Sequence, residues 1–488
     1  MPKKVLAFDF GASSGRAMLG SFQNGKIEFR EIHRFENNPV SLNGTLYWDF
    51  PYLFQQIKVG ITQAKQEGGF DSIAIDTWGV DFGLIDRHGD LLQNPVHYRD
   101  LRTDRMMEEV FAAVPREEVY RQTGIQFMRI NSLYQLMYLA KERPELLERT
   151  EKILFMPDLF SYFLTGKISA EYTMASTTQL MNPNTGDWCY EMLEKLGIPT
   201  RILPKLHDAG TIYGELSDAI CEELDVPKVP VISVAAHDTA SAVAAIPTKE
   251  KDFIYISCGT WSLFGTELEK PCINEKTLHY NLTNEGGINR TTRLLKSTMG
   301  LWLIQESRRQ WRREGFDVSY HDLEVAALAA EPFRSFIDPN APEFEMPGNL
   351  PNRVREFCKR TGQPVPENRG EVMRCIYESL ALKHRSSLEM VEDITGRNYE
   401  TIHVIGGGVK DGFLCQITAN ACNKKVVAGP MEATVTGNIA VQLMTLGEFE
   451  NLSQVRQAVA ASSNTKTYLP ADCKKWDAVY ERFLQYQA

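Results

Sequence analysis

The sequence predicts an α/β protein built from two duplicated domains with mixed sheets. At 488 residues, the chain is too long for one ordinary core. Strand-like runs alternate with helical patterns, and each half opens with a strand, a turn and a second strand. The opening "LAFDFGASSGRAMLG" is repeated in design by "IYISCGTWSLFG" near the middle of the chain. We therefore place two domains at residues 1–247 and 248–488.

The first half opens with three predicted strands. Residues 5–10 form an apolar run that ends near Asp9, residues 11–16 are predicted as a turn, and residues 17–22 form the second strand. An Asn-Gly pair then precedes a third strand at 26–35. Because Asn-Gly between two strand-like runs is a strong hairpin signal, these strands are expected to be antiparallel neighbours.

The remaining elements follow from hydrophobic spacing and turn residues. In the first half we expect a helix at 50–66, a strand that turns and returns at 71–86 and a mainly helical stretch at 103–149. A helix at 157–167 with its C-cap at Gly166 follows, and then a strand that leads into a small-residue helix at 229–246. In the second half we expect a strand, turn and strand at 251–268 and three helices at 302–313, 323–330 and 369–394. A strand, glycine turn, helix and strand follow at 401–429, and a last helix at 434–444.

Composition excludes several classes of protein. The net charge is −10, whereas broad nucleic-acid binding needs a basic surface. No run approaches the roughly 18 apolar residues that span a membrane, and the start "MPKKVLAFDF" does not resemble a signal peptide, so we expect a cytoplasmic protein. Nine cysteines contain no C-x-x-C pair. Cys358 and Cys375 lie on two helix-like segments and are either two free thiols or a pair.

Two glycine-containing turns have the composition of anion-binding loops. Such loops need exposed backbone N–H groups without obstructing side chains, and residues 11–15 and 259–262 provide Gly, Ala, Ser and Thr. The first turn leads into a strand, so it is neither a P-loop nor a dinucleotide fingerprint. One interpretation is a pair of hairpin tips that hold a triphosphate. The alternative is a plain tight turn at each hairpin.

Other residues could complete such a site. Asp9 could help to hold Mg²⁺, which prefers oxygen ligands and needs only one or two carboxylates. The glycines at 406–408 could lie against a purine ring, or form a simple strand-to-helix turn. Asp238 begins a helix and is either an N-cap or a base that accepts a hydroxyl proton during phosphoryl transfer. His237 beside it is either structural or a hydrogen-bond partner for a sugar.

Ten segments in order resemble the FGGY carbohydrate kinases over the whole chain. They are "FDFGASSGR", "IDTWGVDFGLID", "PVHYRDLRT", "IQFMRINSLYQL", "MPDLFSYFLTGK", "HDTASAV", "SCGTWSL", "NEGG", "MGLWLIQ" and "GGGVKDGFLCQITA". This resemblance implies two ribonuclease-H-like domains of the actin/hexokinase/Hsp70 ATPase class around a central cleft. The motifs DTWGVDF and GASSGR are similar to those of the branch whose acceptor sugar is L-rhamnulose.

The resemblance also implies roles for individual residues. Asp238 is the expected general base and Asp9 assists Mg²⁺. The residues expected to bind ATP are Ala12, Ser13, Ser14, Gly15, Arg16, Thr260, Gln305 and Gly407. Those expected to bind the sugar are Gly79, His237, Asp238, Thr239 and Ser297. Ser297 departs from the family pattern, in which some relatives have Asn, so the resemblance implies a weaker sugar contact at this position.

Four further residues could belong to the sugar pocket near Gly79, and two of them also have a structural interpretation. Trp78 either stacks on a sugar or packs in the core, and Asp81 either binds a hydroxyl or pairs with Arg99 or Arg102. Tyr98 and Arg102 are candidates for the sugar pocket.

The expected activity is transfer of the γ-phosphoryl group of MgATP to L-rhamnulose, by a monomer or small homo-oligomer without nucleic-acid or membrane partners. One alternative is a kinase for L-fuculose, xylulose or a similar ketose. The other is an ATP-binding scaffold on the same fold, which would need no acceptor base at Asp238.

Overall fold

The computed structural model describes residues 2–487, which fold into two compact units. The first unit contains residues up to 249 together with 267–294 and 433–463. The second contains residues 250–266, 295–432 and those from 464 onward. The first unit thus includes two segments from beyond residue 247. The division into family domains at 247/248 stays a prediction.

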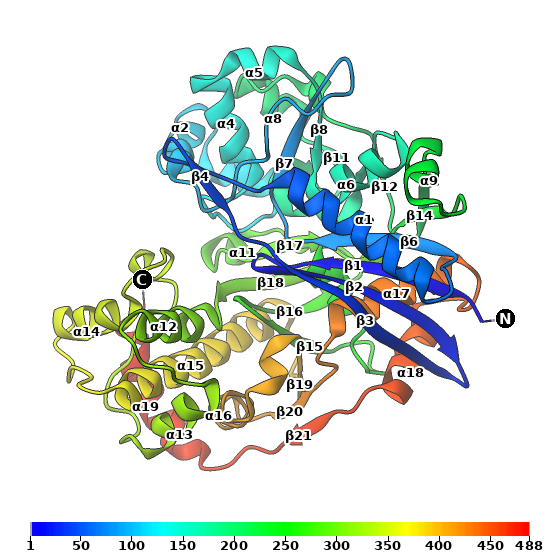
Figure 1. Ribbon diagram of the computed structural model, residues 1–488. Helices are drawn as coiled ribbons and strands as arrows, with labels where there is room; N and C mark the ends of the chain where they lie inside the picture. Colours follow the sequence, from blue (N-terminus) through cyan, green and yellow to red (C-terminus); the bar gives the residue numbers. More distant parts are fainter. Residues whose placement is uncertain (1, 488) are drawn as a thin grey trace. The chain divides into compact units, whose positions relative to one another are not determined.

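The sheet of the first unit begins with the predicted hairpins. β1 pairs antiparallel with β2, and β2 with β3. The turn between β2 and β3 has positive φ angles at Asn24 and Gly25, as the Asn-Gly signal predicts. β6 joins β1 in parallel (Figure 1). The strand order is β13 (Thr211–Glu215), β14 (Pro230–Ser233), β6 (Ser72–Thr77), β1 (Lys4–Phe10), β2 (Ser14–Gln23) and β3 (Lys26–Glu36).

The sheet of the second unit repeats this plan. β15 pairs antiparallel with β16 and parallel with β19, as β1 pairs with β2 and β6. β20 is parallel to β19 and antiparallel to β21, as β14 is to β6 and β13. Both units therefore have the same strand arrangement, and the predicted duplication is confirmed. The strand order is β17 (Thr283–Gly286), β18 (Thr292–Met299), β16 (Trp261–Leu268), β15 (Ile254–Cys258), β19 (Thr401–Ile405), β20 (Lys425–Ala428) and β21 (Lys466–Tyr468), in which β17 is an additional edge strand.

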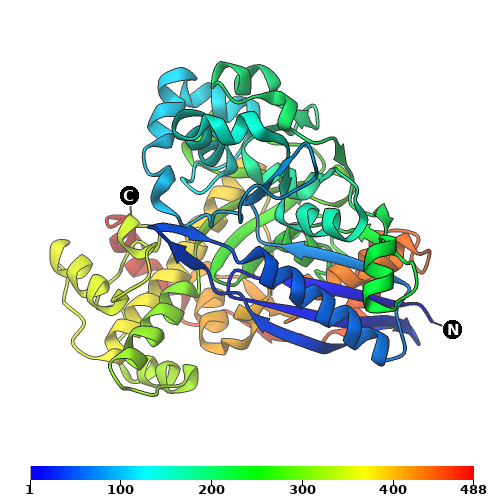
Figure 2. The same cartoon turned by 45° about the horizontal axis from the view of Figure 1, so that its top comes forward.

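Helices cover both faces of the first sheet. α1 (Phe50–Gln66) and α6 (Met156–Thr165) pack on the face that carries Phe8 and Phe10. Figure 2 shows α1 lying across the strands of this sheet. α10 (Asp238–Ala244) and α17 (Ala433–Thr445) pack on the other face. Since side chains alternate between faces along a strand, Asp9 points away from its aromatic neighbours, toward the α10–α17 side.

A further core in the first unit surrounds a separate two-stranded sheet. β7 pairs with β8 and not with β6, so the predicted return of the chain at 71–86 is wrong. The interruption lies at residues 78–81, which carry candidate site residues. The elements around this core are β7 (Phe82–Asp86), β8 (Thr150–Phe155), α2 (Met106–Ala113), α3 (Arg116–Thr123), α4 (Ser132–Glu142), α5 (Pro144–Arg149), α7 (Tyr172–Ala175) and α8 (Tyr190–Lys195).

The remaining helices complete the two units. The first unit has α9 (Asp218–Leu224), α11 (Glu275–His279) and α18 (Leu452–Ser462). The second has α12 (Trp302–Arg313), α13 (Tyr320–Ala329), α14 (Leu350–Arg360), α15 (Arg369–Thr395), α16 (Gly412–Cys422) and α19 (Cys473–Leu484). The short strands are β4 (Val40–Leu42), β5 (Thr45–Tyr47), β9 (Ala170–Glu171), β10 (Met181–Asn182), β11 (Asp187–Trp188), β12 (Leu206–His207) and β17 (Thr283–Gly286).

Two sequence expectations are resolved by these helices. The helix at 434–444 is not the last, because α18 and α19 follow it. Cys358 in α14 and Cys375 in α15 are both buried free thiols, so the free-thiol interpretation is confirmed. A hydrogen bond from Cys375 lowers the pKa of the Cys358 thiol. Within residues 2–487, no helix has both the length and the apolar character needed to cross a membrane.

Candidate active site

Two carboxylates lie side by side at the ends of β1 and β6. Asp9 and Asp76 are partners in the parallel register, so both point to the same face of the sheet. Asp9 Oδ2 accepts a hydrogen bond from Arg16 at 2.6 Å, and Asp76 Oδ2 accepts one from Asn438 of α17 at 2.6 Å. Asp76 Oδ1 is buried without a hydrogen-bond partner in the described chain. Burial and then the negative charge of Asp9 raise the pKa of Asp76 well above its usual value.

The first predicted loop is a tight turn of three residues between β1 and β2. Gly11 N donates to Ser14 O at 2.9 Å, and Arg16 is already paired with Asp9 in the hairpin. The predicted turn at 11–16 was too long, because Ser14, Gly15 and Arg16 belong to β2. Packing also favours glycine at position 15, because a Cβ on Gly15 would lie 2.2 Å from the Phe35 ring.

The catalytic candidate Asp238 is the first residue of α10. His237 occupies the N-cap position without a capping side-chain hydrogen bond, so the interpretation of Asp238 as the N-cap is wrong. Buried Glu171 holds the turn that precedes α10, because its Oε2 accepts a hydrogen bond from Ala236 N at 3.2 Å. Thr77 N donates to Ala236 O at 2.9 Å, which joins this turn to the end of β6. The site thus starts where two neighbouring strands end.

The environment of Asp238 raises the pKa of its carboxyl group. Burial and then the negative charge of Asp9 raise its pKa to about 7, against the hydrogen bonds from Thr239. Thr239 Oγ1 donates to Asp238 Oδ1 at 3.0 Å. Of the Asp238 side chain, 33% remains exposed, so solvent can still reach it. A carboxyl with this pKa can exchange a proton near neutral pH, which is the property required of a general base.

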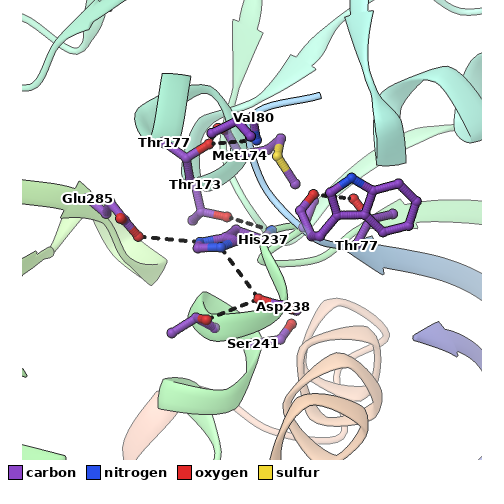
Figure 3. Close-up of polar contacts among 12 residues, drawn as sticks. Thr77, Val80, Thr173, Met174, Thr177, His237, Asp238, Ser241 and Glu285 are labelled. Carbon is purple, nitrogen blue, oxygen red and sulfur yellow. Dashed lines mark hydrogen bonds and ion pairs between the residues drawn. The ribbon is translucent and has the colours of Figure 1, made fainter. Parts of the chain in front are cut away.

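His237 lies between Asp238 and two further charged groups. Its Nε2 is 3.4 Å from Asp238 Oδ1, and its Nδ1 is 3.4 Å from Glu285 Oε2 (Figure 3). Arg293, in β18, places NH2 3.1 Å from His237 Nδ1. Burial and then the positive charge of Arg293 hold the pKa of His237 well below its usual value. The imidazole is consequently neutral in this setting.

Gly79 packs closely against the His237 ring and Thr177. A Cβ at Gly79 would lie 3.1 Å from Thr177 Oγ1 and 3.4 Å from His237 Nε2. The next residue, Val80, has φ 69°, which is strained for a β-branched side chain. Hydrogen bonds hold it there: Val80 N donates to Thr177 Oγ1 at 3.3 Å, and Ser132 Oγ donates to Val80 O at 2.5 Å. This backbone geometry places Gly79 beside His237.

Asp81 anchors the same segment through two indoles. Its Oδ2 accepts hydrogen bonds from Trp48 Nε1 at 2.7 Å and Trp78 Nε1 at 3.0 Å, and its Oδ1 accepts one from Gln135 Nε2 at 3.0 Å. Asp81 is fully buried, and Trp78 packs in the core against Trp48 with ring centroids 4.0 Å apart. The core interpretation of Trp78 therefore holds. The carboxylate of Asp81 accepts hydrogen bonds from both indoles, and Arg102 also interacts with it electrostatically, so the predicted arginine pairing stays a prediction.

We expect Asp81→Asn to destabilise the first unit by about 2 kcal/mol. An amide in place of the carboxylate presents an N–H₂ group to neighbours that are themselves donors, which leaves buried donors unsatisfied. Urea unfolding followed by tryptophan fluorescence measures this change. Exposed Asp90 nearby serves as the matched control, because Asp90→Asn should change stability by less than about 0.5 kcal/mol. Equal stability of both variants would contradict the anchoring role.

In the second unit, the loop between β15 and β16 packs on the start of α12. Gly300 N and Trp302 N donate to Thr260 O at 3.0 and 3.3 Å, and Leu301 N donates to Gly259 O at 2.9 Å. A Cβ at Gly300 would lie 2.7 Å from Trp261 C, so only glycine allows this close approach. The structure thereby brings Thr260 together with the first turn of α12.

Other predicted nucleotide residues lie around the same loop. Gln305 is in the first turns of α12, and its N donates to Leu301 O at 2.8 Å. The glycine turn after β19 is packed on Cys258, because a Cβ at Gly408 would be 2.4 Å from Cys258 Sγ. Gly407 has room for a Cβ there, 3.8 Å from Cys258 O. Ser297 lies in β18 among second-unit residues, and its predicted sugar contact stays a prediction.

Sequence reasoning missed several residues that shape these sites. Asp76 was missed, although it lies near the end of an apolar strand in the same way as Asp9 does. Glu285 lies within the motif "NEGG" but was given no role, and Arg293 carried no local signal. Asn37, which donates through Nδ2 to Gly11 O at 2.9 Å and fixes the first loop, also carried none.

Comparisons with known proteins agree with this arrangement. Residues 4–245 match the N-terminal domain model of the FGGY family of carbohydrate kinases, and residues 254–446 match its C-terminal domain model. The chain is 44% identical over 484 residues to a protein named rhamnulokinase from Bacteroides thetaiotaomicron, covering 99% of both. It is 40% identical to a rhamnulokinase of Bacillus subtilis, covering 96% of this chain and 95% of that protein.

Solved structures share the fold at low sequence identity. A ligand-bound xylulose kinase from Lactobacillus acidophilus superposes with a TM-score of 0.81 at 19% identity, covering 99% of this chain and 97% of that one. Plasmodium falciparum glycerol kinase with ADP gives a TM-score of 0.79 at 15% identity, covering 99% and 97%. The ribonuclease-H-like two-domain fold predicted from the sequence is thereby confirmed.

Proposed function

Since the chain belongs to the FGGY family of carbohydrate kinases, we propose that it phosphorylates L-rhamnulose with ATP, giving L-rhamnulose 1-phosphate and ADP. The observation that carries the phosphoryl-transfer part is the placement of Asp238, a partly exposed carboxyl with a pKa raised to about 7. The choice of sugar rests on full-length similarity to proteins named rhamnulokinase, at 44% identity for the Bacteroides protein.

Asp238 supplies the base that this reaction needs. In its ionised form the carboxylate accepts the proton of the O1 hydroxyl as that oxygen bonds to the γ-phosphorus, and the bond from phosphorus to the β,γ-bridging oxygen breaks to release ADP. Thr239 holds Oδ1 by its hydrogen bond at 3.0 Å, which orients the carboxylate. Gly79, His237 and Ser297 are the proposed sugar contacts. Gly79 lies beside His237, and a Cβ there would crowd the ring at 3.4 Å from Nε2.

The proposed nucleotide residues come from both units. In the first, Ala12, Ser13, Ser14, Gly15 and Arg16 would hold phosphate oxygens, and in the second Thr260, Gln305 and Gly407 would serve the nucleotide. The small residues of the first loop leave backbone N–H groups accessible, while Arg16 adds a positive charge that now pairs with Asp9 at 2.6 Å. Phosphoryl transfer depends chiefly on such positioning and charge neutralisation.

The donor set at Asp9 fits Mg²⁺. Two adjacent carboxylates, one with a buried oxygen lacking a partner in the described chain, offer the oxygen ligands that this ion prefers. Among residues 2–487 no group of three or more His, Cys, Asp or Glu forms a metal site. This suits an ion that keeps most of its waters. Asp9, with Asp76 beside it, would hold the ion, which when bound neutralises phosphate charge.

A sugar panel tests the proposed function. We expect ADP release with L-rhamnulose to exceed that with L-fuculose, D-xylulose, L-ribulose or glycerol by at least about tenfold in kcat/KM, since a pocket built for one set of hydroxyls leaves polar groups unpaired with another. A coupled ADP assay with MgATP measures this. Reactions without sugar supply the control for ATP hydrolysis. Preference for another ketose would replace the substrate, and sugar-independent hydrolysis alone would contradict the kinase assignment.

A further inference from the structure

Arg293 is a fully buried cation with no contact to solvent. Its side chain is 0% exposed, and its Nε donates to Gly286 O at 2.8 Å. NH2 lies 3.1 Å from Glu285 Oε2 and 3.1 Å from His237 Nδ1. Burying a guanidinium is costly unless its charge is paired and its donors are used. The pairing with Glu285 balances the charge, while the contact with His237 remains to be explained.

The contact with Arg293 determines which His237 nitrogen carries the proton. A guanidinium has only donors, so Nδ1 must accept the hydrogen bond from NH2 and cannot itself carry a proton. Nδ1 is also 3.4 Å from Glu285 Oε2, but that oxygen accepts no hydrogen bond from it. The neutral ring must then carry its proton on Nε2.

The Nε2–H group of His237 faces the proposed reaction site. Nε2 lies 3.4 Å from Asp238 Oδ1 (Figure 3). Gly79 lies close to the same nitrogen, since a Cβ there would be 3.4 Å from it. A donor in this position can bind the carboxylate of Asp238 or an oxygen of an acceptor placed beside Gly79. The opposite tautomer would present a lone pair to the carboxylate, and the two would repel each other.

We propose that Arg293 is a positioning residue that locks His237 in the neutral Nε2–H tautomer, so that His237 donates to the Asp238 carboxylate or, when the acceptor sugar is bound, to one of its oxygens. Glu285 holds Arg293 in place and balances its charge. The kinetic part of this assignment rests on the proposed function, whereas the tautomer itself does not. A residue that only stabilised the fold would leave the tautomer unchanged when replaced.

The tautomer can be read directly in the full-length enzyme. Labelling the nine histidines with ¹⁵N and comparing spectra of the wild type and His237→Asn assigns the His237 ring signals. We expect a neutral ring with the proton on Nε2 in the wild type. In Arg293→Gln we expect a mixture of tautomers, and in Arg293→Lys, which keeps a cationic donor, the wild-type pattern. A wild-type ring protonated on Nδ1 would overturn the proposal, even if Arg293→Gln does not fold.

Kinetics with the sugar give a second readout. Arg293→Gln should lower kcat about 10–100-fold and raise the KM for the sugar, with the KM for ATP unchanged, while Arg293→Lys should recover most of the loss. Arg456→Gln is the matched control, since Arg456 pairs with Glu267 at 2.8 Å in the same unit and is at most slightly exposed. It should lower stability without changing the tautomer or the KM.

The two proposals can fail independently. If the wild type turns over no sugar, the proposed function fails, but the ¹⁵N spectra still test the tautomer. If the sugar is turned over and Arg293→Gln leaves both the tautomer and the KM for the sugar at wild-type values, the role of Arg293 is refuted while the kinase activity stands.

Discussion

Asp238→Asn is expected to lower kcat for sugar phosphorylation by about 10²–10⁴-fold, the usual contribution of a general base. The amide keeps the shape of the carboxyl and can still accept a hydrogen bond from Thr239, which now spans 3.0 Å. It cannot take up the hydroxyl proton. The affinity for ATP should remain within about threefold, because the loss lies in the chemical step. Steady-state kinetics and nucleotide titration measure both quantities.

The same substitution is expected to stabilise the protein at high pH. The folded-state pKa of Asp238 is raised to about 7 from the usual 3.8, so the native state binds a proton that the unfolded chain releases. Stability therefore falls as pH rises from about 4 to 7, and the full cost is present above pH 7. Because 33% of the side chain is exposed, we discount the cost to about 2 kcal/mol.

Asp238→Asn should thus raise Tm by about 3 °C at pH 8 and by almost nothing at pH 4. Asp218, the first residue of α9, provides a control at the same helix position, but it is exposed and pairs with Lys228 at 2.7 Å. Asp218→Asn should leave kcat unchanged and lower stability by at most about 1 kcal/mol. An active Asp238→Asn enzyme, or one without a pH-dependent gain in Tm, would contradict the role given to Asp238.

Local signals predicted most of the elements because they act over a few residues. Asn24 and Gly25 adopt the positive φ angles that their types favour, and α12 has the predicted bounds Trp302–Arg313. The repeat of strand, turn and strand correctly indicated duplication, since each copy must bury the same kind of sheet. The errors arose where one local sequence pattern is compatible with two different pairings in the folded protein. The segment after β6 resembles a returning strand, but β7 pairs with β8 instead.

The site could be predicted only as far as its residues carry chemistry in their own sequence context. Asp238 was found because a carboxylate follows an apolar strand and precedes small residues. Its electrostatic partners are distant in sequence: Arg293 and Glu285 reach His237 from β18 and β17, 56 residues away in the case of Arg293. Asn438 reaches Asp76 across 362 residues. Such contacts depend on sheet register and helix packing, which no local pattern encodes.

The packing of α17 on α10 leads to the second large effect. Gly437→Ala is expected to destabilise the first unit by at least about 3 kcal/mol. A Cβ at Gly437 would lie 1.9 Å from Ser241 O and 2.6 Å from Ser241 C, and backbone atoms cannot rotate away as a side chain can. The two helices would have to separate. The better helix propensity of alanine, worth about 1 kcal/mol, is too small to compensate.

Activity should fall together with stability in Gly437→Ala, because both helices carry site residues. α10 begins with Asp238, and the residue after Gly437 is Asn438, which holds Asp76 at 2.6 Å. A displacement of even a few tenths of an ångström at this contact moves the base relative to Asp9. We expect kcat to fall by about tenfold or more in the fraction that folds, since small misplacements of catalytic groups are costly. Urea unfolding and kinetics on the same preparation measure both effects.

Thr434→Ala is the matched control for Gly437→Ala, because it adds alanine to the same helix at a half-buried position. It should change the free energy of unfolding by less than about 0.5 kcal/mol and leave kcat at the wild-type value. If Gly437→Ala matched this control, α10 and α17 would be able to separate without loss, and their close approach would not be what holds Asp238 in position. If Gly437→Ala lost stability but kept full kcat, the contact would support the fold without positioning the base.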